Sequence, residues 1–418
     1  MRRKFIVNRL SAFLSGRMSF LVLMAAAAAL KLVISAVVPA SHDLRNILIS
    51  VEFGSDQSSP WVALEAQMFE FWRSVTHSTQ SGADWWQTPP PAMSMDLRLL
   101  SLFLRLPTFV FDLAIAFTLY FTILRLASSR EAKLVTLLWF LNPFTTFEIE
   151  MLSVPDVAAT FLTLVAVFFL LRKREILAGL FLAAGIAVKL YPILLVPPIL
   201  LYARERLETR LRSQVLLVLL PLCGLIAYLG WVFPTGKFSL APFTDYSPIT
   251  QPMTVMFVFG YPVHYISVAS VALVTFYFAI WVFAKRAIWI TDTILPVLLV
   301  YYTFFNPYPQ YFVWALPFLT LDVILVRRQR LPLLALLLAL AFGAWFTLSA
   351  AYLTPSGYSL FLFPLEAANL PWYSQMINSF LRSNSAELVA PLLFSALYAT
   401  TLIYALDVAR GWFALKPE

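Results

Sequence analysis

The stretch that decides the fold is the apolar run MSFLVLMAAAAALKLVISAVVPA, residues 18–40. It contains one charged residue, Lys31, and it follows the basic segment MRRKFIVNRLSAFLSGR. A run of about 20 apolar residues crosses the hydrocarbon core of a bilayer as an α-helix. The run is also longer than the roughly 7–15 apolar residues of a cleaved signal. We therefore predict a retained first membrane span near residues 19–40, although Val37–Ser41 would permit cleavage.

The whole chain has the composition of an integral membrane protein. Of its 418 residues, 61% are hydrophobic and 12% are charged, and the mean hydropathy is +0.80. Soluble domains carry about 25% charged residues. Because apolar runs recur along the entire length, we predict one all-α, multi-pass membrane domain over residues 1–418. The single cysteine, Cys223, excludes an intramolecular disulfide and a cysteine-based metal site.

The apolar runs predict about twelve membrane-spanning helices with both termini in the cytoplasm. They lie near residues 19–40, 99–124, 134–150, 153–171, 176–188, 190–202, 213–233, 266–284, 287–304, 311–326, 331–353 and 389–409. Most of the 30 Lys and Arg residues fall in the segments predicted to be cytoplasmic, whereas the outer loop 41–97 has seven acids and two bases. The net charge of +8 therefore indicates topology and contacts with anionic lipid, not binding of nucleic acid. The membrane would be the plasma membrane of a prokaryote or the endoplasmic reticulum of a eukaryote.

Two places interrupt the regular pattern of spans. Only 29 residues separate Arg174 from Arg204, which is too short for two full crossings. We predict a short or re-entrant helix pair with its tip near Lys189–Pro192. In the segment 134–171, Asn142-Pro143 and Pro155-Asp156 break the apolar pattern near the predicted outer end. Irregular backbone at membrane depth is tolerated where it is buried in protein or lines a wet cavity.

The first and last outer loops, 41–97 and 354–388, each contain a predicted amphipathic helix. In the first loop, Ser59-Pro60 has the pattern of an N-cap followed by a first-turn proline. The predicted apolar face carries Trp61, Leu64, Met68, Phe71, Trp72 and Val75. In the last loop, Trp372, Tyr373, Met376, Ile377, Phe380 and Leu381 repeat this spacing after Pro371. Such helices lie in the membrane interface or pack on the other loop, and the sequence leaves both interpretations open.

Ionisable residues near the outer ends of the spans are the candidates for chemistry, because charges at membrane depth cost free energy. The set is Lys31, Asp43, Asp96, Arg98, Arg105, Asp112, Glu148, Glu150, Asp156 and Lys189. Carboxylates can accept a proton from a hydroxyl acceptor, and cations can stabilise a departing phosphate. The alternative is that these residues pair with one another and hold the loops together.

Asp43 is the strongest single candidate, because it directly follows the first span. Its neighbour His42 could be a hydrogen-bond partner or a metal ligand. Only three histidines exist, which disfavours a histidine-rich metal site. The carboxylates leave room for a bound divalent cation, Mg²⁺ or Mn²⁺. No Walker A, H-E-x-x-H or G-x-S-x-G sequence is present, which disfavours a nucleotide-driven pump or a membrane zinc protease.

Several stretches, in order over roughly residues 20–330, resemble the C-type (GT-C) membrane glycosyltransferases, in particular the catalytic subunit of GPI mannosyltransferase I and its microbial relatives. The matching stretches are His42-Asp43, Trp86-Gln87-Thr88-Pro89-Pro90, Leu141-Asn142-Pro143 followed by Glu150 and Asp156, Lys189-Leu190-Tyr191-Pro192, and Gln310-Tyr311-Phe312-Val313-Trp314. Lys-x-Tyr-Pro and Gln-Tyr-Phe-x-Trp are the most specific of these. The chain departs from the family pattern at Arg45, where a second acid usually stands, and at Ala187, which is often histidine.

The resemblance implies transfer of mannose, or another hexose, from a polyprenyl- or dolichyl-phosphate carrier to a glycolipid or glycan acceptor on the non-cytoplasmic face, with inversion. Asp43 would be the catalytic base. The implied substrate-binding residues are His42, Arg98, Glu150, Asp156, Lys189, Tyr191, Gln310 and Tyr311. Lys189 would hold the carrier phosphate, although a snorkelling lysine at a helix end has the same pattern.

Two other functions stay open at this stage. The first is a non-catalytic lipid-glycan-binding subunit of a larger membrane complex, with a small membrane subunit as partner. The second is a transporter or flippase for a lipid-linked sugar, but the chain shows no convincing internal repeat of the kind that many transporters have.

Overall fold

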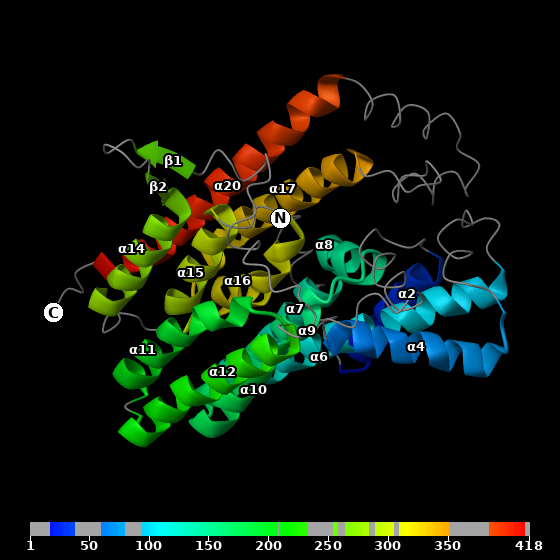
Figure 1. Ribbon diagram of the computed structural model, residues 1–418, viewed down its shortest axis with the longest axis horizontal. Helices are drawn as coiled ribbons and strands as arrows, with labels where there is room; N and C mark the ends of the chain where they lie inside the picture. Colours follow the sequence, from blue (N-terminus) through cyan, green and yellow to red (C-terminus); the bar gives the residue numbers. More distant parts are fainter. Residues whose placement is uncertain are drawn as a thin grey trace, which may run out of the picture. The chain divides into compact units, whose positions relative to one another are not determined.

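The structure is a computed structural model that describes residues 17–37, 60–79, 94–207, 209–232, 254–257, 264–283, 289–304, 309–351 and 384–413 (Figure 1). These residues are mostly helical. Four helices are long and apolar enough to cross a membrane: Ser19–Val37, Met95–Leu126, Leu211–Gly230 and Leu392–Arg410. They overlap four of the predicted spans, which supports a helical membrane protein. Each of the other eight predicted ranges also contains helix, but a total of twelve crossings stays a prediction.

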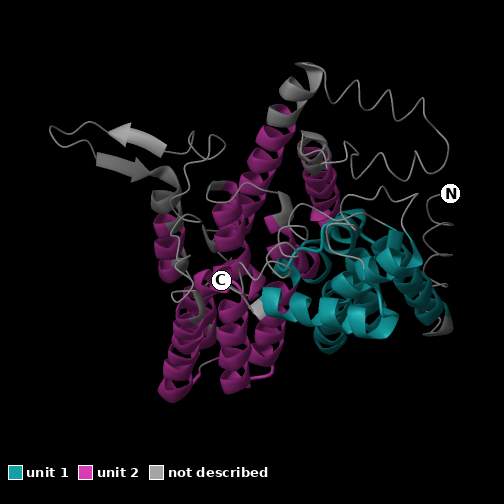
Figure 2. Ribbon diagram, turned by 45° about the vertical axis from the view of Figure 1, so that its right-hand side comes forward, with its two compact units in different colours: residues 1–157, 323–328, 346–387 teal, residues 158–322, 329–345, 388–418 magenta. Residues whose placement is uncertain are grey.

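The contacts within the chain divide it into two compact units, which we describe separately (Figure 2). Unit 1 comprises residues 1–157, 323–328 and 346–387. Unit 2 comprises residues 158–322, 329–345 and 388–418.

Unit 1 is built around the long helix α6, Met95–Leu126, which packs against α2 (Arg17–Val37), α4 (Pro60–Thr76) and α7 (Ser129–Phe140). Ser94 caps the N-terminus of α6, because its Oγ accepts a hydrogen bond from the Leu97 amide at 3.3 Å. Ser128 and Glu131 form a capping box at the start of α7. These caps give both α6 and α7 a defined start.

The predicted break at Asn142-Pro143 is present. After α7, Asn142 caps the short helix α8 (Pro143–Thr145), since its Oδ1 accepts from the Phe144 amide at 3.0 Å. The chain continues as a π-helix, η2 (Thr146–Met151), and then as α9 (Asp156–Leu171). Between them, Ser153 has a positive φ of 58°, which is uncommon for a residue other than glycine. π-helical turns are often found at functional sites.

Helix α4 packs on α6 through a face that coincides only in part with the predicted one. Phe69 and Trp72 are buried with Leu97, Leu100 and Leu104. Trp61 is also buried, and so is Glu65. In contrast, Phe71 and Val75 are about half exposed, at 50% and 54%. The helix therefore has an inner face against α6 and a separate outer apolar edge.

Unit 2 contains residues 158–171 of α9, and the following elements lie in it entirely: α10 (Glu175–Val188), η3 (Tyr191–Leu195), α11 (Val196–Arg206), α12 (Leu211–Val232), α14 (Val268–Phe283), α15 (Thr291–Phe304) and η7 (Pro309–Trp314). It also contains most of α17 (Leu331–Ala351) and α20 (Asn384–Phe413), whose residues 346–351 and 384–387 belong to unit 1. Helix α16 (Leu316–Leu325) crosses the boundary between the units. Two short antiparallel strands, β1 (Thr254–Phe257) and β2 (His264–Ser267), were not predicted.

Helices α10 and α12 pack closely along each other (Figure 1). A Cβ atom on Gly224 would lie 2.3 Å from the backbone oxygen of Ala183. The two helices can approach this closely because both residues are small, as is common where membrane helices meet.

A polar network joins the later helices of unit 2. Asp322 accepts hydrogen bonds from Tyr404 at 2.7 Å and from Thr291 at 3.1 Å. Arg330 forms an ion pair with Asp322 at 3.5 Å and another with Asp407. Both carboxylates therefore have a cationic partner, and the network ties α15, α16 and α20 to the start of α17.

Candidate functional site

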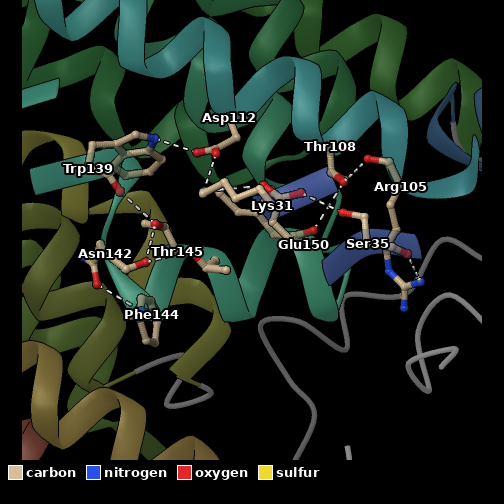
Figure 3. Close-up of polar contacts among 12 residues, drawn as sticks. Lys31, Ser35, Arg105, Thr108, Asp112, Trp139, Asn142, Phe144, Thr145 and Glu150 are labelled. Atoms are coloured by element: carbon tan, nitrogen blue, oxygen red, sulfur yellow. Dashed lines mark hydrogen bonds and ion pairs between the residues drawn. The ribbon is translucent and has the colours of Figure 1, made fainter. Parts of the chain in front are cut away.

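The candidate residues form two groups, one in each unit. The first is the buried charge cluster of unit 1, which we define as Lys31, Ser35, Arg105, Asp112 and Glu150. Figure 3 shows these side chains together with Trp139. Lys31, Asp112 and Glu150 are each 0–2% exposed, so this part of the protein encloses several charges in a small volume.

Lys31 is the cation at the centre of this cluster. Its Nζ lies 2.5 Å from Asp112 Oδ2 and 3.5 Å from Glu150 Oε1. Trp139 Nε1 donates to the other oxygen of Asp112 at 2.7 Å. Ser35 Oγ donates to Glu150 Oε2 at 3.2 Å. One ammonium therefore serves two carboxylates, and each carboxylate has an additional neutral donor (Figure 3).

Arg105 makes the second set of contacts in this cluster. Its Nη1 donates to the backbone oxygen of Ser35 at 3.2 Å, and its Nη2 donates to the backbone oxygen of Met151 at 3.0 Å. Ser101 Oγ also donates to the Ser35 oxygen, at 2.8 Å. The cluster therefore joins α2, α6 and the π-helix by hydrogen bonds as well as by ion pairs.

Glu65 is a buried acid that is not among the predicted site residues. Its Oε1 accepts a hydrogen bond from Trp61 Nε1 at 2.6 Å. Burial raises the pKa of Glu65 to about 8, and the Trp61 hydrogen bond and the charge of Arg105 only partly offset this effect. Trp61 and Glu65 are four residues apart, so in a helix they lie on the same side. This spacing is the sequence signal from which a buried Glu65 could have been predicted.

The second group is the lysine–aromatic cluster of unit 2, which we define as Lys189, Tyr191, Tyr311 and Trp314. Helix α10 ends at Val188, and Lys189 adopts extended backbone with φ −153° and ψ 139°. The 3₁₀ helix η3 begins at Tyr191. The predicted helix break near Lys189–Pro192 is therefore present, and it turns the chain where the lysine stands.

The two most specific motifs of the resemblance meet in this cluster. The rings of Tyr191 and Trp314 stack with centroids 4.0 Å apart and an interplanar angle of 4°. The Lys189 Nζ lies 4.9 Å from the centroid of the Tyr311 ring and 5.8 Å from that of Trp314. These distances are in the range of cation–π attraction. Lys189 is half-buried, whereas Tyr191 is buried and donates through its hydroxyl to Thr160 at 3.1 Å.

The remaining candidates are placed as follows. Arg98 is half-buried in the first turns of α6. Asp156 is buried at the first position of α9, where a negative charge is favoured by the helix dipole. The backbone of Gln310 belongs to η7, but its side chain, like His42 and Asp43, lies outside the described part of the structure.

Among the described residues, no group of three or more His, Cys, Asp or Glu side chains could hold a metal ion. Comparison of the chain with protein-family models, with curated proteins and with solved structures gave no match.

Proposed function

We propose that this protein is a membrane glycosyltransferase that moves a hexose, mannose in the first instance, from a polyprenyl or dolichyl phosphate to a glycolipid or glycan acceptor. In this proposal the chain crosses the membrane about twelve times with both termini in the cytoplasm. The reaction takes place on the non-cytoplasmic face, which the acidic loop 41–97 would occupy.

The lysine–aromatic cluster is the observation that carries the proposal. Lys189 stands at a break between helices, where the ammonium group lies over aromatic rings at 4.9 and 5.8 Å. A fixed ammonium group can hold a phosphate, and it stabilises the negative charge that develops when the phosphate departs. Tyr311, which is half-buried, offers apolar ring surface next to it to a sugar or to the first part of a prenyl chain, while the buried pair Tyr191 and Trp314 supports it.

The proposed reaction is a single displacement at the anomeric carbon. Asp43 accepts the proton of the acceptor hydroxyl while the hydroxyl oxygen forms a bond to the anomeric carbon. The bond between this carbon and the phosphate oxygen breaks, and the carrier phosphate keeps the electron pair; Lys189 is the cation proposed to hold this phosphate. Direct displacement inverts the configuration of the sugar.

A transfer assay with the purified full chain tests the proposal. The donor is polyprenyl-phosphate mannose carrying a radiolabelled sugar, and the acceptors are extracted membrane glycolipids. We expect transfer by the wild type and none by Asp43→Asn. Asp56→Asn, which changes another aspartate of the same loop, is the matched control and should transfer normally. Equal rates for the two variants would refute Asp43 as the base.

A non-catalytic lipid-glycan-binding subunit is the second candidate. Two observations favour it: Arg45 stands where the related enzymes have a second acid, and Glu150 is already paired with Lys31. This candidate predicts saturable binding of the polyprenyl-phosphate sugar that depends on Lys189, without turnover of any acceptor.

A further inference from the structure

Two helix ends in unit 1 leave backbone carbonyl groups that need partners. In a continuous helix the Ser35 carbonyl of α2 would accept from the amide four residues on. Residue 39 is proline, which has no amide hydrogen, so this carbonyl needs a donor from elsewhere. The π-helix ends at Met151, so the Met151 carbonyl is in the same situation. At membrane depth no water is present to hydrogen-bond such a carbonyl, so another part of the protein must supply the donor.

One face of α6 supplies the donors for both helix ends. Ser101, Arg105 and Thr108 are spaced four and three residues apart, which places them on one side of the helix. Ser101 and Arg105 donate to the Ser35 carbonyl. Arg105 donates to the Met151 carbonyl at 3.0 Å. Thr108 Oγ1 lies 2.8 Å from the Arg105 carbonyl oxygen and 3.3 Å from that of Ile149, so its single hydrogen is shared between the two.

Arg105 is the residue that contacts both ends at once. Its two terminal nitrogens bind carbonyls of segments 116 positions apart in the chain, Ser35 and Met151. A guanidinium group holds its donors in a rigid plane, so the two bonds fix the separation of the two carbonyls. Ser35 in turn holds Glu150 through its hydroxyl.

We propose that Arg105 is a positioning residue. It sets the distance between Ser35 in α2 and the segment from the π-helix to the start of α9, which carries Glu150 and Asp156. This inference rests on the proposed function, since Glu150 and Asp156 are among the substrate-binding residues that the resemblance implies. Arg105 itself touches no reacting atom. Its effect is on geometry: an error of about 1 Å in the placement of reacting groups can lower a rate by about a hundredfold.

Arg105→Lys is the informative substitution. Lysine keeps the positive charge, but its single ammonium cannot reproduce the planar fork that binds both carbonyls. Arg73→Lys is the matched control, because Arg73 is partly exposed on α4 and pairs with Glu70 at 3.7 Å. Both variants are made in the full chain.

Two measurements separate a positioning role from a purely structural one. In the transfer assay, we expect Arg105→Lys to lower kcat about a hundredfold and to leave the donor KM unchanged, while Arg73→Lys has the wild-type kcat. The second measurement is the distance between spin labels on cysteines placed at Val37 and Met151 in a Cys223→Ser chain. We expect a single distance when Arg105 is kept and a longer or broader distribution in the Arg105→Lys variant.

Each result decides the inference. An unchanged label distance overturns it, whether or not kcat falls, and so does an equal fall in kcat for Arg73→Lys. If the wild type transfers no sugar, the proposed function fails, while the label distance still tests the role of Arg105. If Arg105→Lys does not accumulate in the membrane, Ser101→Ala removes one of the two donors to Ser35 and is expected to change the same distance less.

Discussion

The buried charge cluster of unit 1 and the lysine–aromatic cluster of unit 2 place a lysine in opposite kinds of surroundings. Lys31 is 2% exposed and contacts two carboxylates. Lys189 is half-buried and lies over aromatic rings. A cation held between two buried acids stabilises the protein around it, whereas a half-buried cation over aromatic rings is the group that the proposed function assigns to the donor phosphate. Under the proposed function, the first cluster supports the site and the second one binds substrate.

Removing the cation from the first cluster should have the largest effect on stability. Lys31→Met leaves Asp112 and Glu150 buried without their ammonium partner. Breaking a buried ion pair in this way costs about 3–5 kcal/mol. The measurement is the free energy of unfolding in detergent micelles. The double variant Lys31→Met/Asp112→Leu is expected to be less destabilised than the single one, and the same loss in both would contradict a pairing role.

Glu65 should make the stability of unit 1 depend on pH. Its pKa is about 8 in the folded protein and 4.5 in the unfolded chain. The folded state therefore keeps a proton that the unfolded chain has lost. Its contribution to stability is fully present below pH 4.5 and is lost as the pH rises through about 8. Unfolding followed from about pH 5 to about pH 9 should show this decline in the wild type and a flatter profile in Glu65→Gln.

Lys189→Ala should weaken donor binding and leave stability almost unchanged. Loss of about 1.4 kcal/mol of interaction with the phosphate corresponds to a tenfold higher donor KM. Lys173→Ala is the matched control, because it removes an exposed lysine from the connection between α9 and α10. A donor KM that rises equally in both variants, or in neither, would remove the distinction between the two clusters.

Tyr191→Phe should have the smallest effect. The substitution keeps the ring that stacks on Trp314 but removes the hydroxyl that donates to Thr160 at 3.1 Å. A typical hydrogen bond contributes about 0.5–1.5 kcal/mol to stability. Thermal unfolding should detect this loss, while the donor KM stays at the wild-type value. A large change in donor KM would assign the hydroxyl itself to the ligand.

Local features of the fold could be predicted because they depend on neighbouring residues. Asn142-Pro143 stops a helix wherever it stands, since Asn caps and Pro lacks an amide hydrogen. The break near Lys189 could be predicted because the 29 residues between Arg174 and Arg204 are too few for two full membrane crossings. The buried face of α4 could be predicted only in part: Trp61 and Trp72 are buried as expected, but Phe69 and Phe71 are equally apolar and only the packing against α6 distinguishes them.

The sequence by itself determined that the protein is helical and apolar, that Lys31, Asp112 and Glu150 lie in apolar surroundings, and that the helices break at two places. These properties depend on composition and on residues close together in the chain. Only the tertiary structure decided which charges meet, because Lys31 pairs with residues 81 and 119 positions away. It also decided that Lys189 faces Tyr311 and that Arg105 binds two helix ends. Such contacts depend on how separate helices pack, which periodicity along one helix does not specify.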